Sequence, residues 1–314
     1  MTTTEKATDK DNENEKGKGQ DTEASPDKRT TSYSSDERKI GKLLVIGGAE
    51  DKNEDSMVIL PHFVEMCGGK NARILVCGTP SKSVEEKERT YRELFEKIGV
   101  AEVMEPDVTK RLDGEDEELI AMVRRATGVF FTGGDQLRLT AIVAGTPFGN
   151  EIRHRVFNDG LIAAGTSAGA AAMSSTMVIA GSSSGTVRRA DVSLAPGLGY
   201  WRDTVVDTHF SQRGRVSRML VIFAHNPQVL GVGLDEDTAI EVHPGEKFTV
   251  IGSGAAFVFD GTVTHSSAPE ARDEDVIAMT DSAMHVLPSG YGFDLRTKRP
   301  LLPNGKPVPP KATP

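Results

Sequence analysis

The chain has 314 residues, enough for one large α/β domain or two small ones. Its net charge of −9 argues against broad nucleic-acid binding, and no apolar stretch reaches the roughly 20 residues of a membrane span. The N-terminus lacks the apolar segment of a secretory signal, and Cys67 and Cys77 are too few for a disulfide framework. Composition therefore predicts a soluble, cytoplasmic protein with two buried free thiols and with no nucleic-acid or membrane partner.

The first 38 residues differ in composition from the rest. They are mostly Lys, Glu, Asp, Thr, Ser and Gly, which cannot bury enough apolar surface to offset the entropy lost on ordering. We expect residues 1–38 to be a disordered charged tail and residues 39–301 to form a single α/β domain. Residues 302–314, rich in Pro and Lys, are expected to form a C-terminal tail.

Short apolar runs alternate with amphipathic segments through the first half of this domain. In chain order we expect a strand at 43–46, a helix at 58–67, strands at 74–76 and 100–104 around a helix at 84–98, a helix at 115–126, a strand at 129–131, a helix at 151–157 and a strand at 161–164. Nearly continuous apolar strands alternating with helices predict a largely parallel sheet with helices on both faces. Ligands bind at the carboxyl ends of such strands.

The second half is richer in strand signals. An apolar pair at 205–206 precedes an Arg-rich helix at 214–224. Four further runs, at 229–234, 239–242, 248–251 and 256–259, are expected to be successive antiparallel strands. The fold class predicted is thus α/β with additional antiparallel strands in the C-terminal half.

The segment Gly165-Thr166-Ser167-Ala168-Gly169 reads G-x-S-x-G between an apolar run and a run of small residues. A strand, a sharp turn and a helix in this order are typical of a nucleophile elbow, in which a strained serine exposes its hydroxyl above the sheet. Glycines flank the serine because side chains there would clash. The segment predicts Ser167 as a nucleophile.

A serine nucleophile needs a base and a supporting acid. His209 follows the apolar run 205–206, so it is expected at a strand's carboxyl end, as Ser167 is. Carboxylates follow the run 229–234 in the same way. Glu236 is the preferred acid, with Asp235 and Asp207 as alternatives.

The reaction also needs donors for a developing oxyanion. The backbone N–H of Ala168 is one candidate, and the turn Gly133-Gly134 after the fourth strand offers the other. No phosphate-loop or dinucleotide motif is present, which disfavours a nucleotide site. The chain order Ser, His, acid differs from the Ser, acid, His order of α/β-hydrolases.

Five segments together resemble the cyanophycinase family of serine peptidases, which also holds aspartyl dipeptidase E. They are GGAED at 47–51, FTGGDQ at 131–136, GTSAGA at 165–170, DTHF followed by RGRxxR at 207–218, and GLDExTA at 233–239. The resemblance runs in order through roughly residues 39–290.

The resemblance implies a fold similar to class I glutamine amidotransferase domains, with a serine where those enzymes have a cysteine. It implies Ser167 as nucleophile, His209 as base and Glu236 as acid, with no metal or cofactor and with a homodimer as the assembly. It also implies a substrate pocket, which holds Gln136, Asp207, Thr208, Arg213, Arg215 and Arg218. The implied reaction is hydrolysis of cyanophycin, a polyaspartate with arginine on each side-chain carboxyl, to β-Asp-Arg dipeptides.

The residue types suit that substrate. The arginines could hold carboxylates bidentately, and Asp207 could hold a guanidinium. Thr208 stands where cyanophycinases often have Gln, which keeps a related aspartyl or isoaspartyl dipeptidase open as an alternative. An unrelated esterase and a non-catalytic binding module on the same fold are further alternatives.

Overall fold

The computed structural model describes residues 39–52, 56–181, 186–260 and 265–309. All described residues belong to one compact unit, Glu37–Pro314. The expected tail at 1–38 and the last five residues of the expected C-terminal tail lie outside the described residues. In the described part, no helix is both long and apolar enough to cross a membrane.

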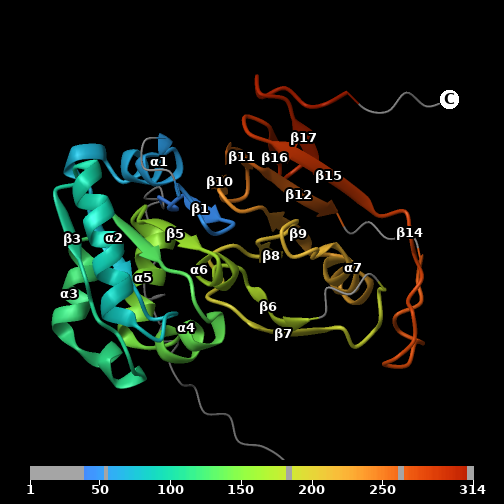
Figure 1. The fold of residues 1–314 in the computed structure, drawn as a ribbon, viewed down its shortest axis with the longest axis horizontal. Coiled ribbons are helices and arrows are strands. Elements are labelled where there is room, and N and C mark those ends of the chain that lie inside the picture. Colours follow the sequence, from blue (N-terminus) through green and yellow to red (C-terminus); the bar gives the residue numbers. More distant parts are fainter. Residues whose placement is uncertain (1–38, 53–55, 182–185, 261–264, 310–314) are drawn as a thin grey trace, which may run out of the picture. The chain divides into compact units, whose positions relative to one another are not determined.

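A nine-stranded sheet forms the centre of this unit (Figure 1), in the order β17-β16-β11-β10-β1-β5-β4-β2-β3. Five strands of the first half pair in parallel: β1 (Leu43–Ile46), β2 (Arg73–Cys77), β3 (Glu102–Met104), β4 (Gly128–Phe131) and β5 (Ile162–Thr166). Four later strands extend the sheet antiparallel beyond β1: β10 (Thr238–His243), β11 (Lys247–Gly252), β16 (Gly292–Asp294) and β17 (Arg299–Leu301).

Helices cover both faces of the parallel part. One face carries α1 (Ile59–Met66) and α2 (Val84–Ile98), and the other carries α3 (Glu117–Arg125), α4 (Gln136–Val143) and α5 (Pro147–Asn158). Both faces of the sheet are apolar, because successive side chains of a strand point to opposite faces. In β1, Leu44 and Ile46 belong to the core under α1 and α2, and Leu43 and Val45 belong to the core under α3, α4 and α5. The predicted α/β class is confirmed. Helix α4 was not predicted, although Asp135 caps it by accepting from the N–H groups of residues 137 and 138.

A second, four-stranded sheet has the order β15-β12-β9-β8. Its strands are β8 (Thr204–Thr208), β9 (Leu230–Leu234), β12 (Ala255–Asp260) and β15 (Ala283–Pro288), and β8 pairs with β9 in parallel. Helix α7 (Val216–His225) connects those two strands. The remaining elements are α6 (Ala168–Ala172), the hairpin of β6 (Thr176–Gly181) and β7 (Val192–Pro196), the short pair β13 (His265–Ser266) and β14 (Met279–Thr280), and two 3₁₀ turns at Gly69–Asn71 and Arg111–Glu115.

The four antiparallel strands expected at 229–234, 239–242, 248–251 and 256–259 are present, but they are divided between two sheets. Strands β10 and β11 belong to the nine-stranded sheet, whereas β9 and β12 belong to the second sheet. The chain changes sheets at two turns, residues 235–237 and 252–254. Gly252 makes the second turn possible, because its φ is +101° and a Cβ there would lie 2.2 Å from the carbonyl oxygen of Asp237.

The two sheets meet at Gly47 and Gly48, just after β1. The N–H of His209 donates to the Gly47 carbonyl at 2.9 Å, and the N–H of Asp237 donates to the Gly48 carbonyl at 2.9 Å. The loops after β8 and β9 are thereby fixed beside the loop after β1. Since β5 pairs with β1 in parallel, the turn after β5 lies at the same edge.

Candidate active site

Ser167 lies on the sharp turn between β5 and α6 that its sequence predicts. Its φ of +52° and ψ of −112° are strained for a residue with a side chain. The two flanking positions must be glycine because a side chain at either would clash with the backbone. A Cβ on Gly165 would lie 2.5 Å from the Gly169 carbonyl carbon, and one on Gly169 would lie 2.3 Å from the Phe131 carbonyl oxygen. The turn therefore holds the serine where its hydroxyl faces the ends of neighbouring strands.

The three side chains expected to act together do meet. The Ser167 Oγ lies 2.8 Å from the His209 Nε2, and the His209 Nδ1 lies 2.8 Å from the Glu236 Oε1. With the proton on Nδ1, the imidazole donates to Glu236 and accepts from the serine hydroxyl. This is the arrangement that general-base activation of a serine requires.

The two alternative acids have other partners. Asp235 accepts from the backbone N–H of Ser211 at 2.9 Å and from that of Ala255 at 3.3 Å. It therefore connects the loop after β9 with the loop after β8 and with the start of β12. Asp207 is 2 % exposed and accepts from the guanidinium groups of Arg215 and Arg218. Of the three carboxylates, Glu236 alone contacts His209 in the described residues.

The surroundings of His209 favour its neutral form. Burial lowers the pKa of His209, and the charges of Arg213 and Arg215 lower it further, while the hydrogen bond to Glu236 opposes them. The bond to His209 and, next, the bond to Lys52 lower the pKa of Glu236. A neutral imidazole beside an ionised carboxylate is ready to accept a proton.

Gly48 provides the surface on which this imidazole packs. A Cβ at Gly48 would lie 2.5 Å from the His209 Cε1 and 2.7 Å from its Nε2, and the φ of Gly48 is +104°. Any side chain at residue 48 would displace the ring from the serine.

The expected oxyanion donors lie next to Ser167. Ala168 is the first residue of α6, so its N–H has no partner within the helix. Gly133 lies beside the nucleophile, since a Cβ there would be 3.5 Å from the Ser167 Cβ. Both positions agree with backbone groups that face a substrate carbonyl on Ser167.

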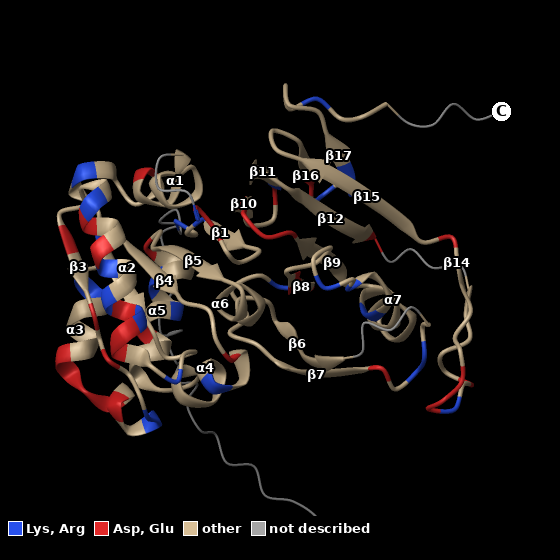
Figure 2. Ribbon diagram, viewed as in Figure 1, with Lys and Arg blue, Asp and Glu red and all other residues tan. Residues whose placement is uncertain are grey.

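A small pocket of about 110 Å³ lies on one side of Ser167 and is strongly basic. It contains all six residues that the resemblance placed in a substrate pocket: Gln136, Asp207, Thr208, Arg213, Arg215 and Arg218. Figure 2 shows basic residues around the start of α7, where these arginines lie. The amide of Gln136 donates to the Val178 carbonyl at 2.6 Å. The Arg215 Nε is buried and has no hydrogen-bond partner among the described residues.

A wider pocket of about 610 Å³ lies beside Ser167 and His209, and part of its lining consists of residues to which the sequence analysis gave no role. Besides Ser167 and His209, the charged or hydroxyl side chains that line it are Glu50, Ser81, Lys82, Lys87, Tyr91, Asp135 and Thr166. Glu50 falls within the Gly-Gly-Ala-Glu-Asp segment after the first strand, which was a usable signal. The lysines and Tyr91 belong to the following βα loop and α2, where nothing in the pattern separates them from an ordinary solvated helix.

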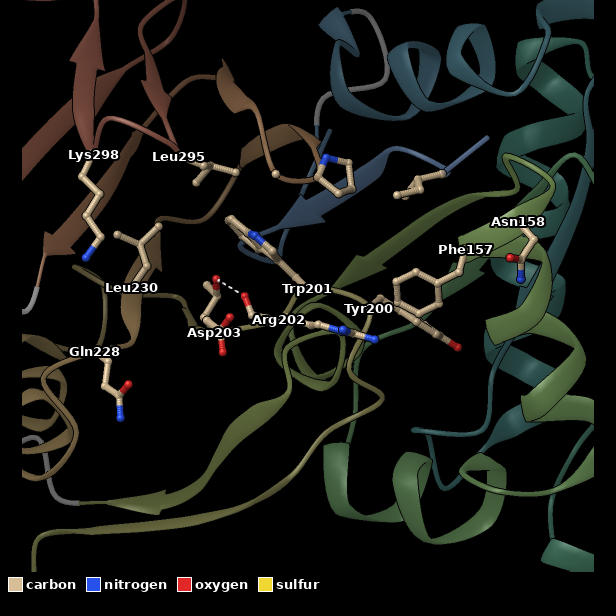
Figure 3. A pocket seen from close by; sticks show the side chains of 14 residues that line it. Phe157, Asn158, Tyr200, Trp201, Arg202, Asp203, Gln228, Leu230, Leu295 and Lys298 are labelled. Atoms are coloured by element: carbon tan, nitrogen blue, oxygen red, sulfur yellow. Dashed lines mark hydrogen bonds between the residues drawn. The ribbon is translucent and has the colours of Figure 1, made fainter. Parts of the chain in front are cut away.

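A third pocket, of about 590 Å³, contains none of these residues. Phe157, Tyr200 and Trp201 line it together with Arg202 and Lys298 (Figure 3). It includes Thr204, the first residue of β8, and so lies at the opposite end of that strand from His209. Among the residues that the structure describes, no group of three or more His, Cys, Asp and Glu side chains is placed to hold a metal ion.

Comparison with known proteins identifies the family of this chain. The model of peptidase family S51 matches residues 43–251. The cyanophycinase of Synechococcus elongatus is 37% identical over 258 residues, which cover 82% of this chain and 80% of that protein. The cyanophycinase of Geminocystis herdmanii is 36% identical over 260 residues, covering 82% and 95%.

A solved structure shares the fold. The crystal structure of a peptidase from an acI-B1 actinobacterium superposes with a TM-score of 0.57 at 20% identity, covering 79% of this chain and 98% of that one. The family match spans more than half of the chain and includes Ser167, His209 and Glu236. The chain therefore belongs to peptidase family S51 and is a serine-type peptidase of the cyanophycinase type.

Proposed function

We propose that this peptidase hydrolyses cyanophycin to β-Asp-Arg dipeptides through an acyl-enzyme. One observation carries the proposal: a Ser167–His209–Glu236 chain of hydrogen bonds borders a small basic pocket. Two cyanophycinases that are 36% and 37% identical to this chain support the choice of substrate.

In the proposed reaction the Ser167 hydroxyl attacks an aspartyl carbonyl while the His209 Nε2 takes its proton. The N–H of Ala168 and the Gly133-Gly134 turn stabilise the resulting oxyanion. The imidazolium, held by Glu236, then protonates the leaving amine. Water, deprotonated by His209, attacks the ester and releases the product with Ser167 restored.

The basic pocket receives a carboxylate in this proposal. Each repeat of the substrate carries an arginyl carboxylate, and Arg213 has no side-chain partner among the described residues. The unpaired Nε of Arg215 is a second donor. Asp207 differs from the expectation that it would hold a substrate guanidinium, because its oxygens already accept from Arg215 and Arg218. We assign it the role of fixing those arginines.

The second candidate function is hydrolysis of aspartyl or isoaspartyl dipeptides. It is favoured by the small volume of the basic pocket, about 110 Å³, and by Thr208, which lines it where a longer Gln is usual in cyanophycinases. We further propose a cytoplasmic homodimer that needs no metal or cofactor.

An activity assay separates these functions. Purified protein is incubated with cyanophycin, β-Asp-Arg and a panel of aspartyl dipeptides, with products resolved by mass spectrometry. We expect β-Asp-Arg from cyanophycin, and a loss of several orders of magnitude in kcat for Ser167→Ala with an unchanged circular dichroism spectrum. Cleavage of dipeptides alone would favour the second function, and full activity of Ser167→Ala would reject the nucleophile.

A further inference from the structure

Glu50 lies beside the nucleophile but takes no part in the proposed chain of proton transfer. Its Oε2 accepts from the Thr166 hydroxyl at 2.6 Å, and its Oε1 accepts from the Tyr91 hydroxyl at 2.7 Å. Thr166 immediately precedes Ser167, whereas Tyr91 belongs to α2. One carboxylate thus connects a helix to the residue before the strained turn.

The backbone is strained on both sides of Glu50. Ala49 and Asp51 have φ values of +53° and +46°, a region that residues with side chains rarely adopt. Such conformations persist only where surrounding contacts hold them. Asp51 supplies part of that hold, since its carboxylate accepts from the backbone N–H groups of Val58, Ile59 and Leu60 at the start of α1. The loop therefore presents the residue 50 side chain to the end of β5 at an energetic cost.

Tyr91 is held as firmly as Glu50. Its ring lies 4.6 Å from that of Phe130 on β4, measured between centroids. Burial and the neighbouring Glu50 raise the pKa of Tyr91 well above its ordinary value, so the hydroxyl keeps its proton and donates it in the hydrogen bond. Thr166 is 3 % exposed and sits in register with Ile46 of β1. Both hydroxyl donors are fixed by packing, which leaves the carboxylate little freedom.

We propose that Glu50 is a positioning residue for the nucleophile: through Thr166 it holds the end of β5 so that the Ser167 Oγ stays within hydrogen-bond distance of His209. This rests on the proposed function in one respect, that Ser167 is the nucleophile, and not on the identity of the substrate. This support keeps the serine reactive, because without it the strained backbone at Ser167 would relax and the hydroxyl would move out of its 2.8 Å contact with the imidazole.

The test measures the reactivity of Ser167 directly. Wild type and the variants Glu50→Ala, Thr166→Val and Thr166→Ser are treated with a serine-directed fluorophosphonate, and the second-order rate of labelling is followed by mass spectrometry. We expect labelling to fall 10- to 100-fold for Glu50→Ala and Thr166→Val. Thr166→Ser, which keeps the hydroxyl, should stay within about threefold of wild type. Thr204→Val is the matched control, because Thr204 is a buried strand threonine whose hydroxyl bonds the Arg202 carbonyl.

Steady-state kinetics of the wild type and of each variant, with cyanophycin as substrate, complete the test. A positioning role lowers kcat and leaves KM within about twofold. Equal labelling of wild type, Glu50→Ala and Thr166→Val would overturn the proposal, as would a raised KM with unchanged kcat, the sign that Glu50 binds a substrate cation instead. Thermal unfolding of each variant shows whether slow labelling comes from a less reactive Ser167 in a folded protein or from loss of the fold. If the fluorophosphonate does not label the wild type, Ser167 is not the nucleophile and the positioning role falls with it. If the probe labels the wild type but the enzyme does not cleave cyanophycin, only the proposed substrate is rejected.

Discussion

At the scale of single residues, the charges around His209 oppose one another. Arg213 and Arg215 favour the neutral imidazole, and Glu236 favours the imidazolium. Arg213 is the exposed member of the pair, so its charge acts through solvent as well as protein. The residues that are proposed to hold the substrate therefore also tune the base.

Arg213→Gln should raise the pKa of His209, because it removes a positive charge that disfavours the imidazolium. A base works in its neutral form, so the pH below which the labelling rate falls should be higher in the variant than in the wild type. The rate of fluorophosphonate labelling from pH 4.5 to 8.5 reports this without depending on substrate binding. Lys306→Gln, an exposed change elsewhere, is the control. An acid limb that stays in place or moves to lower pH would contradict the cause assigned here.

The sequence predicted these residues to different degrees. Ser167 and the strained turn follow from local spacing, and His209 and Glu236 follow from polar residues at strand ends. The pairing of Asp207 with Arg215 and Arg218 could not be predicted, because it depends on how α7 returns across β8. Glu50 was missed for the same reason: its partners are 41 and 116 residues away along the chain.

At the scale of elements, a buried acid on α2 joins the loop after β2 to the loop after β3. Glu88 is 1 % exposed, and its carboxylate accepts from the N–H of Gly78 at 2.9 Å and of Asp107 at 3.1 Å. Burial is the main cause that raises the pKa of Glu88 from 4.5 to about 7. Gly78 begins the loop that lines the wider pocket at Pro80 and Ser81.

Glu88 should make stability depend on pH. Its folded pKa is raised, so its contribution is complete below about pH 4.5 and is lost as pH rises through about 7. Relative to Glu88→Gln, the wild type should lose roughly 3 kcal/mol of unfolding free energy across that interval. Urea unfolding at pH 4.5, 5.5, 6.5 and 7.5 measures the difference, with Glu86→Gln on the exposed face of α2 as control. Parallel pH curves for wild type and Glu88→Gln would show that Glu88 does not titrate in this range.

Element prediction succeeded where packing is local and failed where it is not. Periodicity found α1, α2 and all five parallel strands, because each buries a face of its own residues. It missed the β6–β7 hairpin, whose strands are half exposed and gain their order from each other and from β8. It gave β9 and β10 as separate strands but not their division between two sheets, because alternation along a strand does not show which sheet the strand joins.

At the scale of the folded unit, the two sheets share one core. Val206, Val232 and Val258 of the second sheet pack in the same cluster as Val45 and Val129 of the main sheet. The chain's one tryptophan, Trp201, is 4 % exposed within this cluster and stacks edge-on against Phe248 of β11. The sheets are therefore expected to unfold together.

Val232→Ala should lower the free energy of unfolding by about 2 kcal/mol, from lost burial and the cavity left behind. Trp201 fluorescence and far-UV circular dichroism should report a single, coincident transition in urea for wild type and variant. Val286→Ala, at a half-exposed residue of the same sheet, should cost much less. Two separate transitions would show that the sheets are independent.

The junction at Gly47 and Gly48 has a consequence for the order in which the chain is made. The proposed nucleophile is synthesised first, at 167, and the proposed base and acid follow at 209 and 236. His209 nevertheless packs on the loop after β1, the first strand of the sheet to be made. A nascent chain released only as far as β8 holds a serine without its acid and a main sheet without β10 and β11. The three side chains proposed for catalysis can therefore meet only after the late strands have closed the sheet beside β1.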